Sequence, residues 1–517
     1  MTDLYLSSEL TDSRVRTMNN CPINQDGEFI LYWMTSCRRF AFNASLQHAV
    51  TLSNQLKKPV LVVEAVSITH KFANDRILSF MVQGIMDNID EFKENSVSYM
   101  PWVEIKQKAG AKMLRSLSKR SVCVIIDDYP TYTPSKIRDA AGRNLQVRVD
   151  AVDSNGIFPM NWAEKEFTTA YSFRKYVQKN ILDAFHTIPE KNPTQHREGD
   201  LRVSEEIIAN LKDDLGFEST PLEWLWRVAE GGTVGNQAME EFPIDHTVPA
   251  VITSKGGVNE ARIRLQKFLN YRLNKYSTDR NNPDKPAVSG LSPWLHFGHI
   301  SSYEIIQNVL SKENWSPDSL NHEDTGKGTR SGWWGVSESA SSFLDQIITW
   351  RELGFNFAYN REDHATVETI PNWAKLSMKE HLNDDRTIYS LEELERAETH
   401  DEIWNAAQRE LLRTGQMHNY MRMLWGKKIL EWSPSPEIAA ENMIYINDKW
   451  ALDGRDPNSY TGIFWVLGRH DRAWGPERPI FGKVRYMSSE SAYRKLKLKN
   501  YLQKYAKDEN ITLAKFG

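Results

Sequence analysis

Tryptophans gather in the second half of the chain, at spacings that suit redox chemistry. The sequence holds 17 tryptophans, and most of them lie after residue 220. Trp425 and Trp432 are seven residues apart, so an unbroken helix would place them two turns apart on one face, and Trp404 lies in the preceding helical stretch. A bulky helical core is the simplest interpretation. The alternative is a chain of indoles that passes an electron between the surface and a buried redox cofactor.

Two polar stretches could line a binding site. In "GLSPWLHFGHIS" (290–301), Gly290 and Ser292 could offer backbone N–H and hydroxyl donors to an anion at the start of a helix. A helix cap explains the same residues. The stretch "DGRDPNSYTG" (453–462) has the composition of a turn. A calcium loop that began at Asp453 would need Glu at its twelfth position and has Phe464, so we expect no metal there.

Positive charge is concentrated near the end of the chain. Residues 465–505 carry ten Lys and Arg against three acids, whereas the whole chain has a net charge of −4. Trp465, Trp474 and Tyr486 are interleaved with these cations. Cations that contact phosphates and aromatics that stack on bases are typical of nucleic-acid binding. A solvated basic face without a binding function accounts for the composition equally well.

Several other chemistries lack their residues. The sequence contains no HExxH, no G-x-S-x-G, no protein-kinase motif set and no cysteine or histidine cluster with metal-ligand spacing. Hydrolytic and metal-dependent mechanisms are therefore excluded, and we expect no metal ligands.

The first 150 residues alternate apolar runs with helical patterns. The runs at 29–34, 59–66, 96–100, 122–127 and 145–152 read as strands, and helices are expected between them. This alternation predicts a doubly wound, Rossmann-like parallel α/β domain. Neither GxGxxG nor GxxxxGK[ST] occurs at a strand–helix junction, so no phosphate loop is predicted.

The rest of the chain separates into a connection and a helical domain. Residues 1–160 form the predicted α/β domain, 161–255 a charge-rich connection, and 256–517 a nearly all-helical domain with apolar residues at three- and four-residue steps. Three cysteines without metal spacing suit a reducing compartment. Because the opening "MTDLYLSSELTDSR" lacks the apolar core of a signal peptide and no 18-residue apolar run occurs, we expect a cytoplasmic protein.

These features, in this order, resemble the photolyase/cryptochrome family, and most closely the class II cyclobutane pyrimidine dimer photolyases. The resemblance lies in "LSPWLHFGHISS", "FLDQIITWREL", "PNWAKLSM", "THDEIWNAAQ", "TGQMHNYMRMLWGKKILEW" and "INDKWALDGRDPNSYTGIFWVLGRHDRAW". It implies an α/β antenna domain followed by a helical domain that binds FAD. The implied activity is that of a deoxyribodipyrimidine photo-lyase, in which photoexcited reduced FAD donates an electron to a pyrimidine dimer flipped out of DNA.

The resemblance also assigns roles to individual residues. The FAD-binding positions are Tyr276, Ser289, Gly290, Leu291, Ser292, Arg422, Asn447 and Asp453. The electron-transfer chain, from the flavin outward, is Trp425, Trp404 and Trp432. The positions that line the lesion pocket or grip DNA are Arg280, Asn281, Trp350, Trp465 and Arg472. The catalytic positions are Gln346, Trp350, Asn447 and Trp465.

The sequence departs from the class II pattern at a few of these places. Gln346 stands where that pattern usually has Glu, and an amide cannot supply a proton to the lesion. This departure favours the alternative function, a cryptochrome-like flavin photoreceptor with weak or no repair activity. Ser459 occupies a position that is commonly Gly, and Ala44 follows Asn43 where Trp is common. An antenna chromophore of the deazaflavin type, a monomeric state and, in a eukaryote, a nuclear location are further expectations from the resemblance.

Overall fold

The computed structural model describes residues 12–106 and 108–507, and these residues divide into two compact units. The first holds the described residues up to Glu164, Lys179–Gln266 and Leu291–Asp318. The second holds Lys165–Gln178, Lys267–Gly290 and the described residues from Ser319. Most of the opening stretch considered for a signal peptide lies outside the described residues. The domain boundaries expected at 160 and 255 stay predictions.

A six-stranded sheet forms the centre of the first unit, counted over the described residues, with the order β1-β6-β5-β2-β3-β4. Its strands are β1 (Val15–Thr17), β2 (Phe29–Met34), β3 (Val60–Val66), β4 (Ser98–Val103), β5 (Ser121–Asp127) and β6 (Val149–Val152). The pairs among β2 to β6 are parallel, which confirms the predicted parallel α/β domain. The edge strand β1 pairs with β6 in the antiparallel direction and was not predicted.

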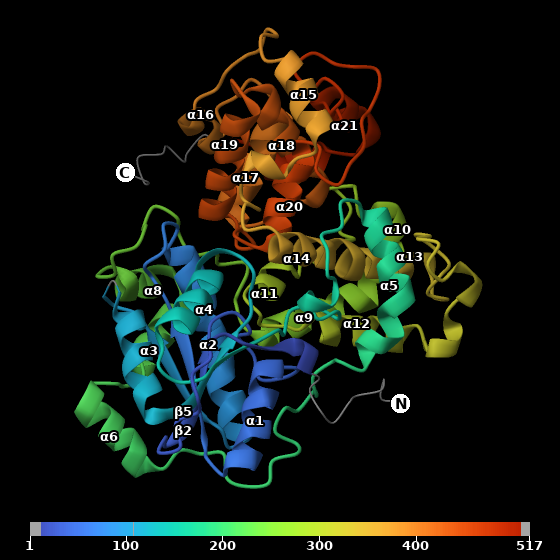
Figure 1. Ribbon diagram of the computed structural model, residues 1–517. Helices are drawn as coiled ribbons and strands as arrows, with labels where there is room; N and C mark the ends of the chain where they lie inside the picture. Colours follow the sequence, from blue (N-terminus) through green and yellow to red (C-terminus); the bar gives the residue numbers. More distant parts are fainter. Residues whose placement is uncertain (1–11, 107, 508–517) are drawn as a thin grey trace. The chain divides into compact units, whose positions relative to one another are not determined.

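Side chains alternate between the two faces of the sheet, and helices cover both faces (Figure 1). In β2, Ile30, Tyr32 and Met34 face a core made with α1 (Ala44–Leu56) and α2 (Asp75–Glu94). The alternate residues Phe29, Leu31 and Trp33 face a core made with α3 (Ala109–Arg120), α4 (Tyr132–Asn144) and α6 (Glu205–Leu215). Burial on both faces explains why these strands read as continuous apolar runs.

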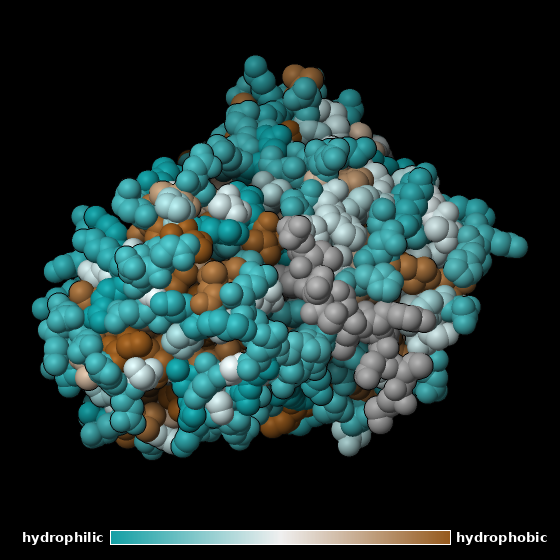
Figure 2. All heavy atoms as spheres, turned by 60° about the horizontal axis from the view of Figure 1, so that its bottom comes forward, coloured by the Kyte–Doolittle hydropathy of each residue, from teal (hydrophilic) through white to brown (hydrophobic). Residues whose placement is uncertain are grey.

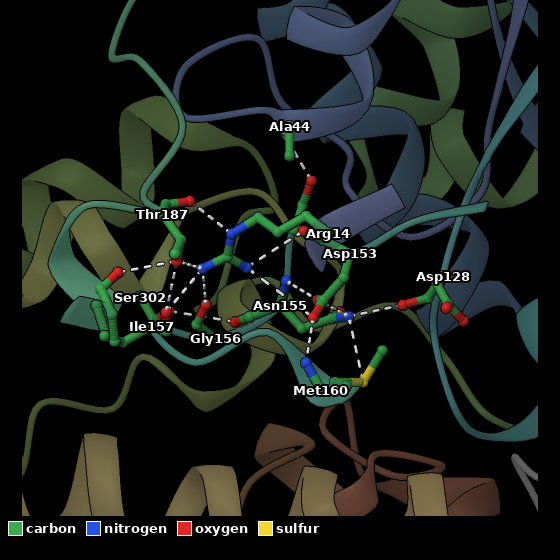
Figure 3. Close-up of polar contacts among 12 residues, drawn as sticks. Arg14, Ala44, Asp128, Asp153, Asn155, Gly156, Ile157, Met160, Thr187 and Ser302 are labelled. Atoms are coloured by element: carbon green, nitrogen blue, oxygen red, sulfur yellow. Dashed lines mark hydrogen bonds and ion pairs between the residues drawn. The ribbon is translucent and has the colours of Figure 1, made fainter. Parts of the chain in front are cut away.

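The short edge strand β1 is anchored by the buried Arg14 that precedes it (Figure 3). The guanidinium donates to the carbonyls of Thr187 at 2.6 Å, Ile157 at 2.7 Å and Gly156 at 3.1 Å. These acceptors lie more than 140 residues away in the sequence. A charged, three-residue segment held by such distant carbonyls carries no hydrophobic pattern, which is why the sequence did not reveal it.

The remaining helices are named here for reference. Those in or entering the first unit are α5 (Ala170–Phe185), α7 (Leu222–Glu230), α8 (Gly232–Met239), α9 (Val258–Tyr271), α11 (Ser292–His296) and α12 (Ser302–Lys312). Those of the second unit are α10 (Tyr276–Asp279), α13 (Glu338–Leu344), α14 (Arg351–Asn360), α15 (Asn372–Glu380), α16 (Leu391–Glu395), α17 (Glu402–Thr414), α18 (Asn419–Glu431), α19 (Pro436–Trp450), α20 (Pro457–Val466), α21 (Ser489–Lys495) and α22 (Lys499–Lys504).

The second unit is helical, as predicted, and its centre is built around α18. Helix α18 packs against α17, α19 and α20, and α20 also packs against α14. Gly426 allows α18 to pack closely against α20, because a Cβ there would lie 2.6 Å from Cγ2 of Val466 on α20. The predicted helical stretch 402–432 is interrupted at Gly415, which has a φ of +67° and caps α17. The chain therefore reverses there and returns as α18.

No helix in the part of the chain that the structure describes is long and apolar enough to cross a membrane. On the face drawn in Figure 2, hydrophilic side chains surround separate hydrophobic areas.

Candidate functional site

The three tryptophans predicted to carry electrons form a continuous path in the second unit. The rings of Trp404 and Trp432 have centroids 5.5 Å apart, and the indole N–H of Trp404 donates to the carbonyl of Trp425 at 3.0 Å. All three side chains are buried, with exposures of 0%, 2% and 3% for Trp404, Trp432 and Trp425. The contacts give the order Trp425, Trp404, Trp432.

Two local features hold this path in place. Asp401 caps α17 by accepting from the backbone N–H of Trp404 at 3.1 Å, which fixes the start of the helix at this indole. The indole N–H of Trp425 donates to Oε1 of Gln408 at 2.9 Å. Gln408 lies on α17 and is fully buried, and it was not among the residues predicted from the sequence. The partners of Trp404 and Trp425 are therefore neutral oxygen atoms.

Beside the start of the path, residues of α18 and α19 and the turn after α19 form a polar wall. Arg422 donates to the carboxylate of Asp453 at 2.9 Å. Asn447 lies on α19 and is buried, with its amide donating to Asp448 at 3.2 Å. The turn 453–456 links α19, which bears Asn447, to α20, which bears Trp465. The structure thus brings into contact Arg422 and Asp453, two residues that the family resemblance assigns to the same FAD pocket.

Asp448, which the sequence did not single out, shapes this turn. Its carboxylate accepts from the backbone N–H of Arg455 at 2.9 Å and from the hydroxyl of Tyr460 at 3.3 Å. Burial raises the pKa of Asp448, against the lowering effect of Arg455. Arg455 has a φ of +67°, a strained value for a residue with a side chain, and the bonds to Asp448 maintain it. The hydroxyl of Ser459 closes the turn by donating to the carbonyl of Asp453 at 2.8 Å.

A second polar surface lies around Gly290 and the loop between α17 and α18. Gly290 has a φ of +68°, and a Cβ built there would meet only Oε1 of Gln416, at 3.9 Å. Nε2 of Gln416 is buried and has no hydrogen-bond partner within the described residues. A buried amide N–H without a partner needs an acceptor, so this loop is suited to a polar ligand. Gln416 was not among the predicted residues.

Tyr276 and Arg280 contact each other on and just after α10. The Arg280 guanidinium lies 5.6 Å from the centre of the Tyr276 ring, and Tyr276 packs edge-on against Phe343. Burial raises the pKa of Tyr276, while Arg280 lowers it. The neighbouring His418 is half-buried, and loss of solvent around its ring lowers its pKa to about 4. The imidazole is therefore neutral at physiological pH.

The predicted run from Ser289 to Ser292 crosses the division between the units. Ser289 and Gly290 belong to the second unit, and Ser289 is half-buried. Leu291 and Ser292 belong to the first unit, where Leu291 is buried and Ser292 is exposed. The capping interpretation of Ser292 is wrong, because the cap position of α11 is Leu291 and no side chain caps this helix.

Gln346 and Trp350 begin and end one turn of an irregular segment in the second unit. Residues Asp345–Trp350 form a π-helix between α13 and α14, and both Gln346 and Trp350 are half-buried. Asp345 is paired with Arg174 at 2.7 Å, which fixes the start of the segment. Wide helical turns of this kind occur frequently at functional sites. Both side chains are partly accessible, as lesion-pocket residues must be.

Trp465, near the end of α20, is surrounded by cations. The amine of Lys427 lies 5.0 Å and the guanidinium of Arg485 5.6 Å from the centre of its ring. Lys427 is fully buried and donates to the carbonyl of Val466 at 2.6 Å. Burial lowers the pKa of Lys427 to about 7, although Asp471 raises it. The ring of Trp465 is itself half-buried.

The basic stretch 465–505 contains both buried and exposed cations. Arg469 is buried and pairs with Glu166, so it is a structural residue. Arg472 is exposed and lies 4.9 Å from the centre of the Trp474 ring, and Asn281 is exposed in another part of the same unit. The other exposed cations of the stretch are Arg478, Lys483, Arg494, Lys495, Lys497, Lys499 and Lys504. Most of the positive charge is therefore accessible to a polyanion.

Within residues 12–106 and 108–507, no group of three or more His, Cys, Asp or Glu could hold a metal ion.

Comparison with known proteins decides the family. The deoxyribodipyrimidine photo-lyase of Methanothermobacter thermautotrophicus is 31% identical over 95% of this chain and 97% of its own length. That of Arabidopsis thaliana is 31% identical over 93% of this chain and 89% of its own length. The chain belongs to the photolyase/cryptochrome family. No protein-family model matches it.

Solved structures of photolyase/cryptochrome proteins share the fold. A class III photolyase from Agrobacterium tumefaciens superposes with a TM-score of 0.57 at 15% identity, over 95% of this chain and 92% of its own. A Synechocystis cryptochrome gives a TM-score of 0.61 at 15% identity, over 92% and 88%. The predicted combination of an α/β domain with a helical domain is thereby confirmed.

The photolyase/cryptochrome family binds FAD, and the residues of the second unit fit this cofactor. The unpartnered N–H of Gln416 and the absence of a side chain at Gly290, which has a φ of +68°, suit the close approach of a phosphate-bearing chain. The Arg422–Asp453 pair and the buried Asn447 amide can donate to and accept from a flavin ring. Trp425 begins the tryptophan path on α18, the helix that also carries Arg422.

Proposed function

We propose that this protein is a DNA repair enzyme that splits cyclobutane pyrimidine dimers in light, of the class II type, with FAD held by the second unit. The observation that carries the proposal is the buried path Trp425–Trp404–Trp432, which begins on the same helix as the Arg422–Asp453 wall. The name deoxyribodipyrimidine photo-lyase on relatives that match nearly the whole chain supports the same activity.

The FAD-binding residues proposed in the second unit are Tyr276, Ser289, Gly290, Gln416, Arg422, Asn447 and Asp453. Leu291 and Ser292, which belong to the first unit, stay predictions from the family resemblance. Gln416 would donate its unpartnered N–H to the phosphate-bearing part, and Asn447 would present its amide to the reacting ring. When bound in its reduced form, FAD supplies light absorption and the electron that splits the dimer.

The residues of the lesion pocket would place a dimer taken out of the DNA stack. Trp350 and Trp465 would flank its two bases, since indole faces replace the stacking lost on flipping. Gln346 would donate a hydrogen bond from its amide to a carbonyl of the dimer. Arg280, Asn281 and Arg472 would contact the sugar-phosphate backbone, which fixes the register of the DNA without reading its sequence.

The tryptophan path would maintain the reduced cofactor. Trp425 would give up an electron first, Trp404 would refill Trp425, and Trp432 would refill Trp404. Because all three indoles are buried, water is kept from the reacting rings. The neutral acceptors of the indole N–H groups of Trp404 and Trp425 hold these rings in place without fixing a charge beside them.

A cryptochrome-like photoreceptor is the second candidate, and Gln346 favours it. An amide keeps the shape of the usual Glu but cannot supply a proton to the split dimer. A Cryptochrome-1 from Sinapis alba is 28% identical over 41% of this chain. A receptor would keep FAD and the tryptophan path, with repair weak or lost.

Illumination of the reduced, FAD-loaded protein with a dimer-containing oligonucleotide tests the proposal. We expect the ultraviolet absorbance of the separated pyrimidines to return in the wild type and to return faster in Gln346→Glu. The matched control Gln346→Leu, which removes both donor and acceptor, should be slower than the wild type.

Two results would contradict this function. Recovery in Gln346→Glu but none in the wild type would establish the photoreceptor, and a folded protein that takes up no FAD would remove both candidates. An antenna chromophore of the deazaflavin type, a monomeric state, and a cytoplasmic or nuclear location stay predictions.

A further inference from the structure

The proposed tryptophan path ends at an indole that solvent barely reaches. Trp432 is 2% exposed, so an electron donor in solution cannot touch its ring directly. It caps the C-terminal end of α18, and within the described residues its ring packs against two further aromatic rings besides that of Trp404. These are Tyr389, with ring centroids 5.3 Å apart, and His400, with ring centroids 5.4 Å apart.

Tyr389 and His400 are joined to each other by a short hydrogen bond. The phenol oxygen of Tyr389 lies 2.6 Å from Nδ1 of His400, and the backbone N–H of His400 donates to the same oxygen at 3.0 Å. In the imidazole tautomer that carries its proton on Nε2, Nδ1 accepts from the phenol O–H, while the phenol oxygen accepts from the backbone. Tyr389 is half-buried and His400 is exposed. The pair therefore leads from the buried Trp432 to the surface.

The backbone holds both residues rigidly. Tyr389 precedes Ser390, which caps α16 in a complete capping box with Glu393. His400 precedes Asp401, which caps α17. The backbone N–H of Tyr389 also donates to the carbonyl of Trp432 at 3.3 Å. Rings fixed at the starts of two capped helices keep their contact with Trp432, as a relay requires.

We propose that Tyr389 and His400 form the surface end of the electron path, as a relay that moves an electron and a proton together. The inference rests on the proposed function, which supplies the oxidised Trp432. Tyr389 passes one electron to the Trp432 radical cation, while the O–H bond of its phenol breaks and the proton goes to Nδ1 of His400. Trp432 becomes a neutral indole, Tyr389 a neutral phenoxyl radical and His400 an imidazolium.

The geometry favours this coupled step over transfer of the electron alone. A phenol that loses an electron becomes strongly acidic, so a base within hydrogen-bond reach lowers the energy of its oxidised form. At 2.6 Å, Nδ1 of His400 is within that reach. After the step the positive charge has left the buried indole for an exposed imidazole. A one-electron reductant in solution, such as a thiol, then restores Tyr389 and His400 returns the proton.

Flash photolysis of the FAD-loaded protein in the presence of dithiothreitol tests the relay. In the wild type, the tryptophan radical should decay into a tyrosyl radical, slower in deuterium oxide because a proton moves. In Tyr389→Phe the tryptophan radical should persist about 100-fold longer, the usual size of a lost acid–base partner. His400→Gln keeps a hydrogen-bond acceptor but removes the base, and it should slow tyrosyl formation by about the same factor.

Two controls separate the relay from a structural role and from a failure of the proposed function. Tyr445→Phe removes a phenol elsewhere in the second unit and should behave as the wild type. If Trp425→Phe leaves light-driven radical formation intact, the proposed path itself is wrong. If Trp425→Phe blocks it but Tyr389→Phe and His400→Gln match the wild type, only the relay is wrong.

The relay can also be tested in the chain without FAD, where a chemical oxidant replaces the light-driven reaction. A ruthenium(III) tris-bipyridine oxidant, generated by a flash in solution with the chain free of FAD, should produce a tyrosyl signal by electron paramagnetic resonance. The part of the signal that Tyr389→Phe removes should also fall in His400→Gln. An equal signal in the wild type and in both variants would overturn the relay.

Discussion

The second unit contains two groups of tryptophans, and their surroundings differ in charge. On the path, Trp404 and Trp425 donate to neutral oxygens and lie deep in the helical core. At the proposed lesion wall, Trp465 has the buried amine of Lys427 and the guanidinium of Arg485 near its ring. The Arg485 guanidinium, a positive charge near the indole face, stabilises the neutral ring and makes removal of an electron harder. The same residue type is thus suited to electron transfer in one place and to stacking in the other.

Trp432 is intermediate between the two groups, because a cation lies near its ring but is paired with a carboxylate. The amine of Lys428 lies 5.5 Å from the centre of its ring, but this amine is paired with Glu431 at 2.9 Å. The adjacent carboxylate offsets the charge that the indole experiences. Adjacent lysines on α18 therefore act on two tryptophans in different ways.

The largest effects are expected when one tryptophan of each group is replaced by phenylalanine. Trp425→Phe should abolish light-driven reduction of FAD and leave the affinity for dimer-containing DNA unchanged. Trp465→Phe should leave reduction unchanged and weaken that affinity by about tenfold, since stacking contributes about 1–3 kcal/mol per base. Absorbance under illumination and fluorescence anisotropy with labelled DNA measure the two quantities. If either variant changed both quantities alike, the division of roles would be wrong.

A smaller effect is expected from the charge of Lys427. Its folded pKa of about 7 lies below the ordinary value of 10.5, so over that interval the unfolded chain holds a proton that the folded chain lacks. Stability contributed by this group therefore rises with pH between these values, by up to about 1.4 kcal/mol per pH unit. In Lys427→Met this rise should disappear, as measured by urea unfolding at several pH values.

The neighbouring lysine supplies the control for that experiment. Glu431 and Asp401 raise the pKa of Lys428 despite its burial. The stability that Lys428 contributes to the folded state is fully present below the ordinary lysine pKa. It is lost only as the pH rises through the pKa of Lys428 in the folded state. Lys428→Met should therefore leave the slope between pH 7 and the ordinary pKa as in the wild type. Equal slopes in the wild type and both variants would show that Lys427 stays charged.

The smallest effect is expected at the turn behind Asp453. Ser459→Ala removes the hydroxyl that donates to the carbonyl of Asp453 and should cost about 1 kcal/mol, the usual net value of one hydrogen bond. The denaturant midpoint and the retention of FAD measure it. Thr461→Ala is the matched control, because its hydroxyl bonds only within α20, to the carbonyl of Pro457. A larger loss of FAD from the control would argue against a role of the turn in the pocket.

The pattern of hydrophobic residues predicted those elements of the fold that bury apolar side chains. Strands β2 and β5 are buried on both faces and read as apolar runs, whereas β1 depends on the distant acceptors of Arg14 and has no such pattern. Gln408 bonds to Trp425 on the neighbouring helix, Asp448 bonds to the turn that follows α19, and the N–H of Gln416 is buried without a partner in the described residues. None of these features leaves a periodic pattern in the sequence.

The family resemblance grouped Trp404, Trp425 and Trp432, and the structure shows how Trp404 comes to contact the other two. Spacing alone joined Trp425 to Trp432 along α18 and left Trp404 apart. The chain reverses at Gly415, so α17 and α18 lie side by side. Trp404 therefore contacts the backbone carbonyl of Trp425 and the ring of Trp432. Pairing of this kind depends on tertiary structure, which periodicity within one helix does not report.

The interleaving of the two units constrains how the chain can be made and divided. Each unit is assembled from three separate segments, and the first is complete only when synthesis has reached Asp318. During translation the early α/β segment must therefore wait for later segments while the ribosome continues. No single proteolytic cut can release either unit whole, and no contiguous gene fragment encodes one. Engineering that exchanges parts between relatives must accordingly move sets of segments together.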